Sequence, residues 1–354
     1  MLTLTAGFAP ICPPGGALVV HHLWVLWVLW GLVTVTLLGH TAVSTSRDRR
    51  ILRSLNSLVA QGRHAEVIDH PLPSRRTRGA VRVLQAGCAV RTGRYAVALA
   101  LLRPYGSEVR GTRPEGPDLV RGSALVGLGR YAEAAALLGD RPDHAGLVHL
   151  RAAVAMEVGD DALAEDLLAA PHTEELAEAG RLRLLGDLRL RRGSLQDAHD
   201  LLTRARSLYA RLGGPGADVD EALCSVLLAR VALLEDSPQQ ALAYVEQGLA
   251  NLRRHSDNVV GLAEAHAVAA EVAAAAADPV AAQEHLRQAH GQAAHCGSPA
   301  LDAELARAAG QVSVRLRHPA EARRWLEEAA RRHEELGAWP AAEQIRHALG
   351  QLDA

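Results

Sequence analysis

Residues 193–205 read GSLQDAHDLLTRA, and the first ten residues of this phrase recur along the chain in more or less divergent form. The copies begin at Gly62, Gly93, Gly129, Gly159, Gly193, Asp236, Ala277 and Arg317. When the copies from Gly93 onward are aligned, they are spaced by 30 to 43 residues. Self-similarity at such a period predicts stacked copies of one supersecondary unit.

Two positions of the repeat are always small. The sixth residue of each copy from Gly93 onward is alanine, at Ala98, Ala134, Ala164, Ala198, Ala241, Ala282 and Ala322. Twelve residues before these anchor alanines stand Ala86, Gly122, Ala152, Gly186, Ala229, Ala270 and Gly310. A small residue at a fixed place in every unit allows a second helix to approach closely there.

The full pattern is a small residue, a turn, and then Ala-x-x-x-Leu-x-x-Ala. It is complete in Ala198-Leu202-Ala205, Ala282-Leu286-Ala289 and Ala322-Leu326-Ala329. This pattern resembles the tetratricopeptide repeat (TPR), over roughly residues 50–337. The resemblance implies an all-α, TPR-like solenoid of about eight antiparallel helix pairs, wound into a right-handed superhelix whose concave face commonly binds peptides or partner proteins. The proline that usually closes the second TPR helix is absent at the expected offset.

The repeats are not uniform. The early second helices are expected to be short, because 96–102 runs into Pro104 and 162–169 into Pro171, whereas the last three units have room for longer helices. The segment 103–117, RPYGSEVRGTRPEGP, predicts a long loop. Residues 339–352 are amphipathic and predict a helix that caps the last apolar face of the solenoid.

An apolar run precedes the repeats. Residues 23–42 carry no charge, and a helix of this length spans about 30 Å, the thickness of the hydrocarbon core of a bilayer. Trp24 and Trp27 are expected near the outer interface, with Trp30 deeper. The basic residues that follow are Arg47, Arg49, Arg50 and Arg53. This arrangement predicts a single-pass transmembrane helix, with the N-terminus outside and the solenoid in the cytoplasm.

The main alternative is a cleaved signal peptide, because Ala42-Val43-Ser44 resembles a cleavage site. Cleavage near Ser44 would export the rest of the chain. Against it, the leader lacks a positive charge and its apolar run is longer than usual. The predicted organisation is an N-terminal segment (1–22), a transmembrane helix (23–42), a basic juxtamembrane segment (43–53), the solenoid (54–337) and the capping helix (338–354).

Charge is distributed unevenly along the chain. Residues 45–130 contain 16 Arg against 6 acidic residues, and residues 131–354 contain 22 Arg against 34 acidic residues. The basic part follows the apolar run, so it is expected to orient the chain in the membrane or to lie against anionic headgroups. It lacks interleaved aromatic residues and a known reading motif, and no nucleic-acid partner is expected.

The sequence offers no catalytic constellation. His290, His295 and Cys296 are close together but diverge on a helix, and His333-Glu334-Glu335 lacks the second histidine of a zinc motif. The neighbours His21 and His22 point in different directions, and the four cysteines stand far apart. Neither a phosphate-binding loop nor a nucleophile elbow occurs. We therefore predict no catalytic, cofactor or metal site, and no enzyme activity.

The TPR alignment nominates a partner-binding groove on the first helices, fifteen, eleven and seven residues before the anchor alanines. The candidates are His149, Arg183, Asp187, Arg191, Arg230, Glu271, Arg307, Gln311 and Arg315. Several arginines along one groove favour an acidic peptide or a C-terminal carboxylate. The alternative is that these are ordinary solvated polar positions.

Together these features predict a membrane-anchored adaptor or scaffold that mediates protein–protein interaction at the cytoplasmic face of the membrane. The alternative function is a regulator whose long C-terminal repeats sense a peptide or a small ligand.

Overall fold

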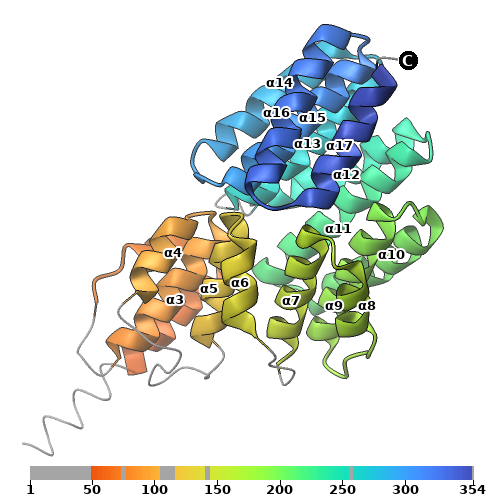
Figure 1. The fold of residues 1–354 in the computed structure, drawn as a ribbon. Helices are drawn as coiled ribbons and strands as arrows, with labels where there is room; N and C mark the ends of the chain where they lie inside the picture. Colours follow the sequence, from red (N-terminus) through yellow and green to blue (C-terminus); the bar gives the residue numbers. More distant parts are fainter. Residues whose placement is uncertain (1–48, 73–76, 104–115, 140–143, 255–257, 353–354) are drawn as a thin grey trace, which may run out of the picture. The chain divides into compact units, whose positions relative to one another are not determined.

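A computed structural model describes residues 49–72, 77–103, 116–139, 144–254 and 258–352 (Figure 1). The chain divides into two units, Met1–Ser54 and Leu55–Ala354. The predicted transmembrane helix with its three tryptophans, and Arg47, lie outside the described residues. In the part of the chain that is described, no helix is both long and apolar enough to cross a membrane.

All regular elements of the described residues are α-helices, arranged in consecutive pairs (Figure 1). The pairs are α3 (Arg78–Arg91) with α4 (Tyr95–Leu102), α5 (Gly116–Gly127) with α6 (Tyr131–Leu138), α7 (Ala145–Val158) with α8 (Asp161–Leu168), α9 (Glu175–Arg191) with α10 (Leu195–Leu212), α11 (Pro215–Leu234) with α12 (Pro238–Arg254), α13 (Val259–Ala275) with α14 (Pro279–Ala293), and α15 (Pro299–Arg315) with α16 (Pro319–Glu335). A helical segment at residues 49–60 and the short α2 (His64–Ile68) come before them, and α17 (Trp339–Leu352) follows. The all-α repeat architecture predicted from the sequence is confirmed.

The two small positions of the repeat lie where paired helices touch. All seven anchor alanines are fully buried. A Cβ atom added to Gly186 would lie 2.7 Å from Leu202 Cγ, and one added to Gly310 would lie 2.5 Å from Leu326 Cδ2. Because real Cβ atoms do not approach other atoms so closely, the helices of these pairs can pack at this distance only without a side chain.

The turn inside each pair uses the left-handed backbone region at the first residue of the repeated phrase. In the early pairs this residue is glycine, with φ between +70° and +89° at Gly93, Gly129, Gly159 and Gly193. The later turns place Asp236, Ala277 and Arg317 at φ of 55° to 59°. Side chains are disfavoured in this region, so the later turns are strained relative to the early ones.

The predicted difference between early and late repeats is confirmed. Helices α4, α6 and α8 have 8 residues each. Helices α10, α12, α14 and α16 have 15 to 18 residues. The capping helix occurs as predicted, with Ala342 and Ile345 buried. Helix α5 begins at Gly116, inside the segment predicted as a loop, and residues 104–115 of that segment are not described.

Candidate functional site

Charged side chains on one face of the first helices form a cluster of ion pairs, and the buried His333 of the second helix α16 lies against it. We call it the charged cluster; its members are Glu157, Asp187, Arg191, Arg230, Glu271, Glu304, Arg307 and His333. They come from α7, α9, α11, α13, α15 and α16. Five of the nine nominated groove residues belong to this cluster, so the structure brings together residues that lie far apart in the sequence.

Glu304 is the centre of the cluster. Its carboxylate lies 3.0 Å from Arg307 Nε, 3.7 Å from an Arg230 nitrogen and 3.6 Å from His333 Nε2. Burial alone would raise the pKa of Glu304, but the neighbouring Arg307, Arg230 and His333 outweigh it and hold this pKa far below its usual range. Glu304 is therefore ionised at neutral pH, and its ion pair with Arg230 links the α11–α12 pair to its own α15–α16 pair.

The other arginines of the cluster also face carboxylates. Arg307 lies 3.4 Å from Glu271, and Arg191 lies 2.6 Å from Glu157 and 3.4 Å from Asp187. The side chains of the cluster are only partly exposed, from 38% at Glu304 down to 4% at His333. The acidic partner predicted from the sequence rested on an excess of arginine, and these carboxylates remove that excess.

A second group of charges lies near the cluster without direct ion pairs of its own. Arg183 faces Asp220 and Tyr209, which raise its pKa although burial opposes the charge. Burial also raises the pKa of Asp220. The pKa of Glu264 is raised to about 7 by burial, which Arg230 only partly offsets. This carboxyl group is therefore partly protonated at neutral pH.

Among the described residues, two pairs of histidines are in contact. Nε2 of the nominated His149 lies 3.1 Å from His172 Nε2, and His266 Nδ1 lies 3.1 Å from His285 Nδ1. Burial and the neighbouring histidine lower the pKa of both His149 and His266 to about 4. His149 and His266 are therefore neutral at pH 7, and a neutral ring can donate or accept a hydrogen bond with the neighbouring histidine.

The remaining nominated residues, Gln311 and Arg315, stay outside the ion pairs recorded for the charged cluster. Gln311 is half-buried, and Arg315 is exposed at the end of α15. The described residues contain no group of three or more His, Cys, Asp and Glu side chains placed to hold a metal ion. Cys88, Cys224 and Cys296 are buried.

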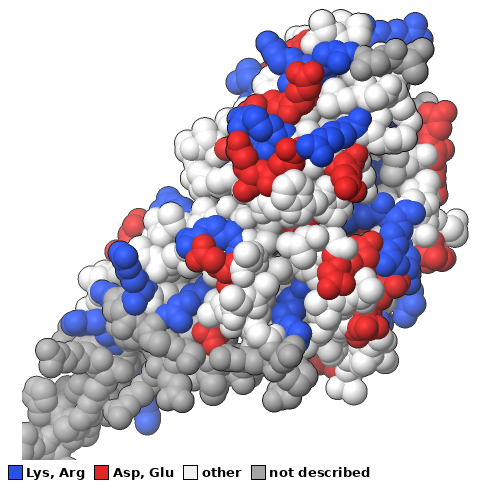
Figure 2. All heavy atoms as spheres, viewed as in Figure 1, with Lys and Arg blue, Asp and Glu red and all other residues white. Residues whose placement is uncertain are grey.

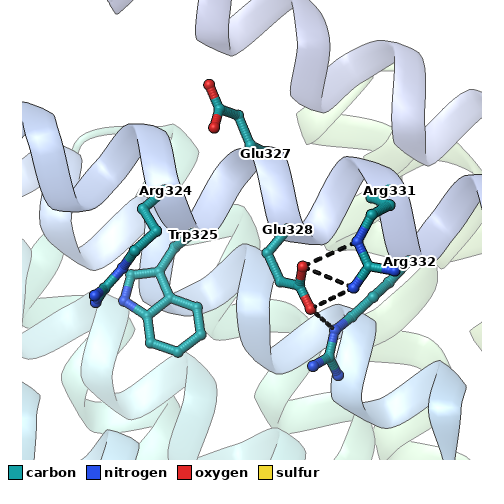
Figure 3. Close-up of a pocket in the computed structure, with 6 residues that line it drawn as sticks. All are labelled: Arg324, Trp325, Glu327, Glu328, Arg331 and Arg332. Atoms are coloured by element: carbon teal, nitrogen blue, oxygen red, sulfur yellow. Dashed lines mark hydrogen bonds and ion pairs between the residues drawn. The ribbon is translucent and has the colours of Figure 1, made fainter.

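An open hollow of about 440 Å³ lies elsewhere, on α16 (Figure 3). It is lined by Arg324, Trp325, Glu327, Glu328, Arg331 and Arg332. Glu328 accepts hydrogen bonds from Arg331 and Arg332, and the guanidinium of Arg324 lies 5.2 Å from the centre of the Trp325 ring. The charges of this hollow are largely paired along the helix itself. On the face seen in Figure 2, positive and negative side chains are likewise interspersed.

Glu157, Glu264, Glu304 and His333 were not nominated from the sequence. Glu264 and Glu304 stand eighteen residues before the anchors Ala282 and Ala322, one helical turn beyond the nominated positions. Glu157 stands seven residues before Ala164, at a nominated position. The same helical periodicity could therefore have found three of these residues. His333 lies on a second helix and follows no such rule.

Comparison with known proteins defines the fold. No protein-family model and no curated protein sequence matches the chain. The crystal structure of a Rap protein complexed with competence and sporulation factor aligns over 88% of this chain and 97% of that chain, at a TM-score of 0.52 and 11% identity. The fold is TPR-like.

Two further solved structures align less well. The APC/C hetero-tetramer Cut9–Hcn1 has a TM-score of 0.49 and 16% identity, covering 75% of this chain and 48% of that chain. Aspartyl phosphate phosphatase F from Bacillus subtilis has a TM-score of 0.40 and 10% identity, covering 78% and 72%. At these identities, the structural likeness concerns the fold alone.

Proposed function

We propose that the protein is a membrane-anchored adaptor or scaffold, which uses the charged cluster to hold a protein or peptide partner at the cytoplasmic face of a membrane. The observation that carries this proposal is the cluster itself. Consecutive first helices of a TPR-like fold present partly exposed arginine and carboxylate groups on a shared face. Charges held in fixed positions by their neighbours select a partner of complementary pattern.

The partner that this cluster favours carries charges of both signs. A purely acidic segment would meet Glu157, Glu271 and Glu304 as well as the arginines. A segment with alternating acidic and basic side chains can replace each internal ion pair with one across the interface. No buried charge is then left unpaired. An unpaired buried charge would cost binding free energy at an interface.

The anchor is supported by the sequence of residues 23–42 and by the basic residues after it, of which Arg49, Arg50 and Arg53 are described and exposed. Tethering at the membrane would raise the effective concentration of the adaptor toward partners there. A reporter fused after residue 354 is expected to be active only in the cytoplasm. Activity only outside would contradict this orientation.

The second candidate function is a sensor, favoured by the long helices α10 to α16. The Rap protein with a similar fold is complexed with competence and sporulation factor. By analogy, the late repeats would bind a peptide or a small ligand without a protein partner. Thermal stabilisation of the chain by a small molecule alone would favour the sensor over the adaptor.

The adaptor is tested by charge reversal with a matched control. Arg191→Glu/Arg230→Glu reverses two charges inside the charged cluster, and Arg287→Glu/Arg324→Glu reverses two that are 73% and 70% exposed outside it. We compare the proteins recovered with each full-length variant from detergent-solubilised membranes, after checking helix content by circular dichroism. Partners should be lost with the first variant and kept with the second. Equal recovery with both would refute the cluster as the binding surface.

A further inference from the structure

Repeats that are far apart in the sequence touch along a line that we call the seam. Its early side is Gly93, Gly127, Gly129 and Gly159, and its late side is Val260, Cys296, Ser298, Leu336 and Pro340. Both sides belong to the compact unit Leu55–Ala354. The seam is therefore a contact within one unit between its first and its last repeats.

Three successive glycine turns each receive a late residue. A Cβ atom added to Gly93 would lie 2.8 Å from Val260, one added to Gly129 would lie 2.5 Å from Leu336, and one added to Gly159 would lie 2.6 Å from Pro340. The late residues thus occupy the space that a side chain would need, in three repeats in succession.

Hydrogen bonding and apolar packing join the two sides as well. The Ser298 hydroxyl donates a hydrogen bond to the Gly127 carbonyl oxygen and accepts one from Leu301 N at the start of α15. Leu336 packs against the core around Leu125 and Tyr131. The seam residues include no charged side chain, so no ion pair between them strengthens the contact.

The seam lies beside the charged cluster. Tyr131 and Glu157 belong to the early repeats, and Glu304 and His333 to the late ones. The pKa of Tyr131 is raised by burial and then by Glu157 and Glu304, so both carboxylates are near its hydroxyl. Burial lowers the pKa of His333, and the nearby charge of Glu157 opposes this shift. Separating the two sides of the seam would uncover these groups.

We propose that the seam opens locally, while the helix pairs on each side stay folded, and that this opening admits the partner to the charged cluster. Neighbouring helices in the stack share long apolar faces, whereas the seam is made at separate points: three glycine turns, the packing of Val260 and Leu336 against early side chains, and one side-chain hydrogen bond. Contacts of this kind open at lower free energy than the core unfolds. The admission of a partner through the opened seam rests on the proposed function. The opening itself rests only on the contacts of the seam.

The thiol of Cys296 reports the opening. It is 8% exposed and covered by the Gly93 turn, whereas Cys224 is fully buried inside α11. The full-length Cys12→Ser protein in detergent is treated with a maleimide across a urea series, and each cysteine is followed by mass spectrometry. Cys296 should react about tenfold faster than Cys224 before global unfolding begins. Reaction of both thiols only in the unfolding transition would overturn the proposal.

Two glycine variants separate the seam from strain in the turn. Gly129→Ala and Gly193→Ala place alanine at nearly the same backbone angle, φ +70° and +76°, but only the first meets a neighbour, since nothing lies within 4 Å at Gly193. Gly129→Ala should therefore speed the reaction of Cys296 by about tenfold or more, and Gly193→Ala should not. Equal effects of the two variants would show that the seam does not control access to this thiol.

A covalent lock tests access to the charged cluster. In Gly93→Cys the new Cβ would lie 3.4 Å from Cys296 Cβ and 2.9 Å from its sulfur, close to the geometry of a disulfide. Diamide accepts the two electrons and two protons released as the two thiols join. The locked protein should lose the partners recovered with the wild type and regain them after reduction.

Unchanged partner recovery by the locked protein would overturn the role of the seam in access. A failure of the proposed adaptor function gives a different result. The Arg191→Glu/Arg230→Glu variant would then keep its partners, and the rates of the thiol reactions would not bear on that result.

Discussion

The close approach of α15 and α16 at Gly310 predicts the sign of a single substitution. In Gly310→Ala the new methyl would lie 2.5 Å and 2.7 Å from two Leu326 side-chain carbons and 3.3 Å from the Leu326 backbone nitrogen. Leu326 is fully buried, so its side chain has little room to move. Overpacking of this kind costs about 1–3 kcal/mol, while replacing a helical glycine by alanine gains up to about 1 kcal/mol.

Gly291→Ala is the matched control, because Gly291 is also helical and nothing lies within 4 Å of its added Cβ. It should keep the helical gain without the clash. The two variants should therefore differ in unfolding free energy by about 1–3 kcal/mol, the overpacking cost alone. Urea unfolding followed by circular dichroism measures this difference. If Gly310→Ala were as stable as Gly291→Ala, the close approach inferred at the small repeat position would be refuted.

Three other substitutions test features described above. Ala277→Gly relieves a side chain at φ 57° and should raise stability by about 1 kcal/mol in thermal unfolding; a lower Tm would contradict the strain. Glu304→Gln removes the carboxylate that faces Arg230, Arg307 and His333. It should lower the free energy of unfolding in urea by about 1–2 kcal/mol, a modest cost because solvent screens a carboxylate that is 38% exposed. The pKa of His149 and His266 falls to about 4 on folding, so the unfolded chain binds more protons below pH 6.5. Stability should therefore be full above pH 6.5 and decline as pH falls toward 4. Urea midpoints against pH should show a shallower decline for His266→Gln, and an equal decline would refute the assignment.

The local structure of the repeats could be predicted from the sequence because it depends on neighbours in the chain. The anchor alanines, the close approach at Gly310 and the capping helix all follow from helical periodicity and side-chain size. The left-handed turns at Asp236, Ala277 and Arg317 were also within reach, since glycine holds the same place in the earlier phrases.

The ion-pair partners of the candidate site could not be predicted in the same way. Arg230 of α11 meets Glu304 of α15, with the α13–α14 pair between them in the sequence. Which charges meet depends on the rotation from each repeat to the next, which the local pattern does not encode. Five of the nominated residues lie together in the charged cluster, but its role in partner binding stays a prediction. The pairing of each arginine with its carboxylate, and the seam, required the structure.

The seam also limits how this array can change its length. In an open array of repeats, a unit can be duplicated or lost with little effect beyond its immediate neighbours. Here the Ser298 hydroxyl donates a hydrogen bond to the Gly127 carbonyl, 171 residues away, and the turns at Gly93, Gly129 and Gly159 meet late residues in the same order along the chain. Inserting or deleting one helix pair between them would shift every one of these contacts out of register. The number of repeats between the two sides of the seam is therefore fixed by geometry, and variation in repeat number is expected only outside that interval.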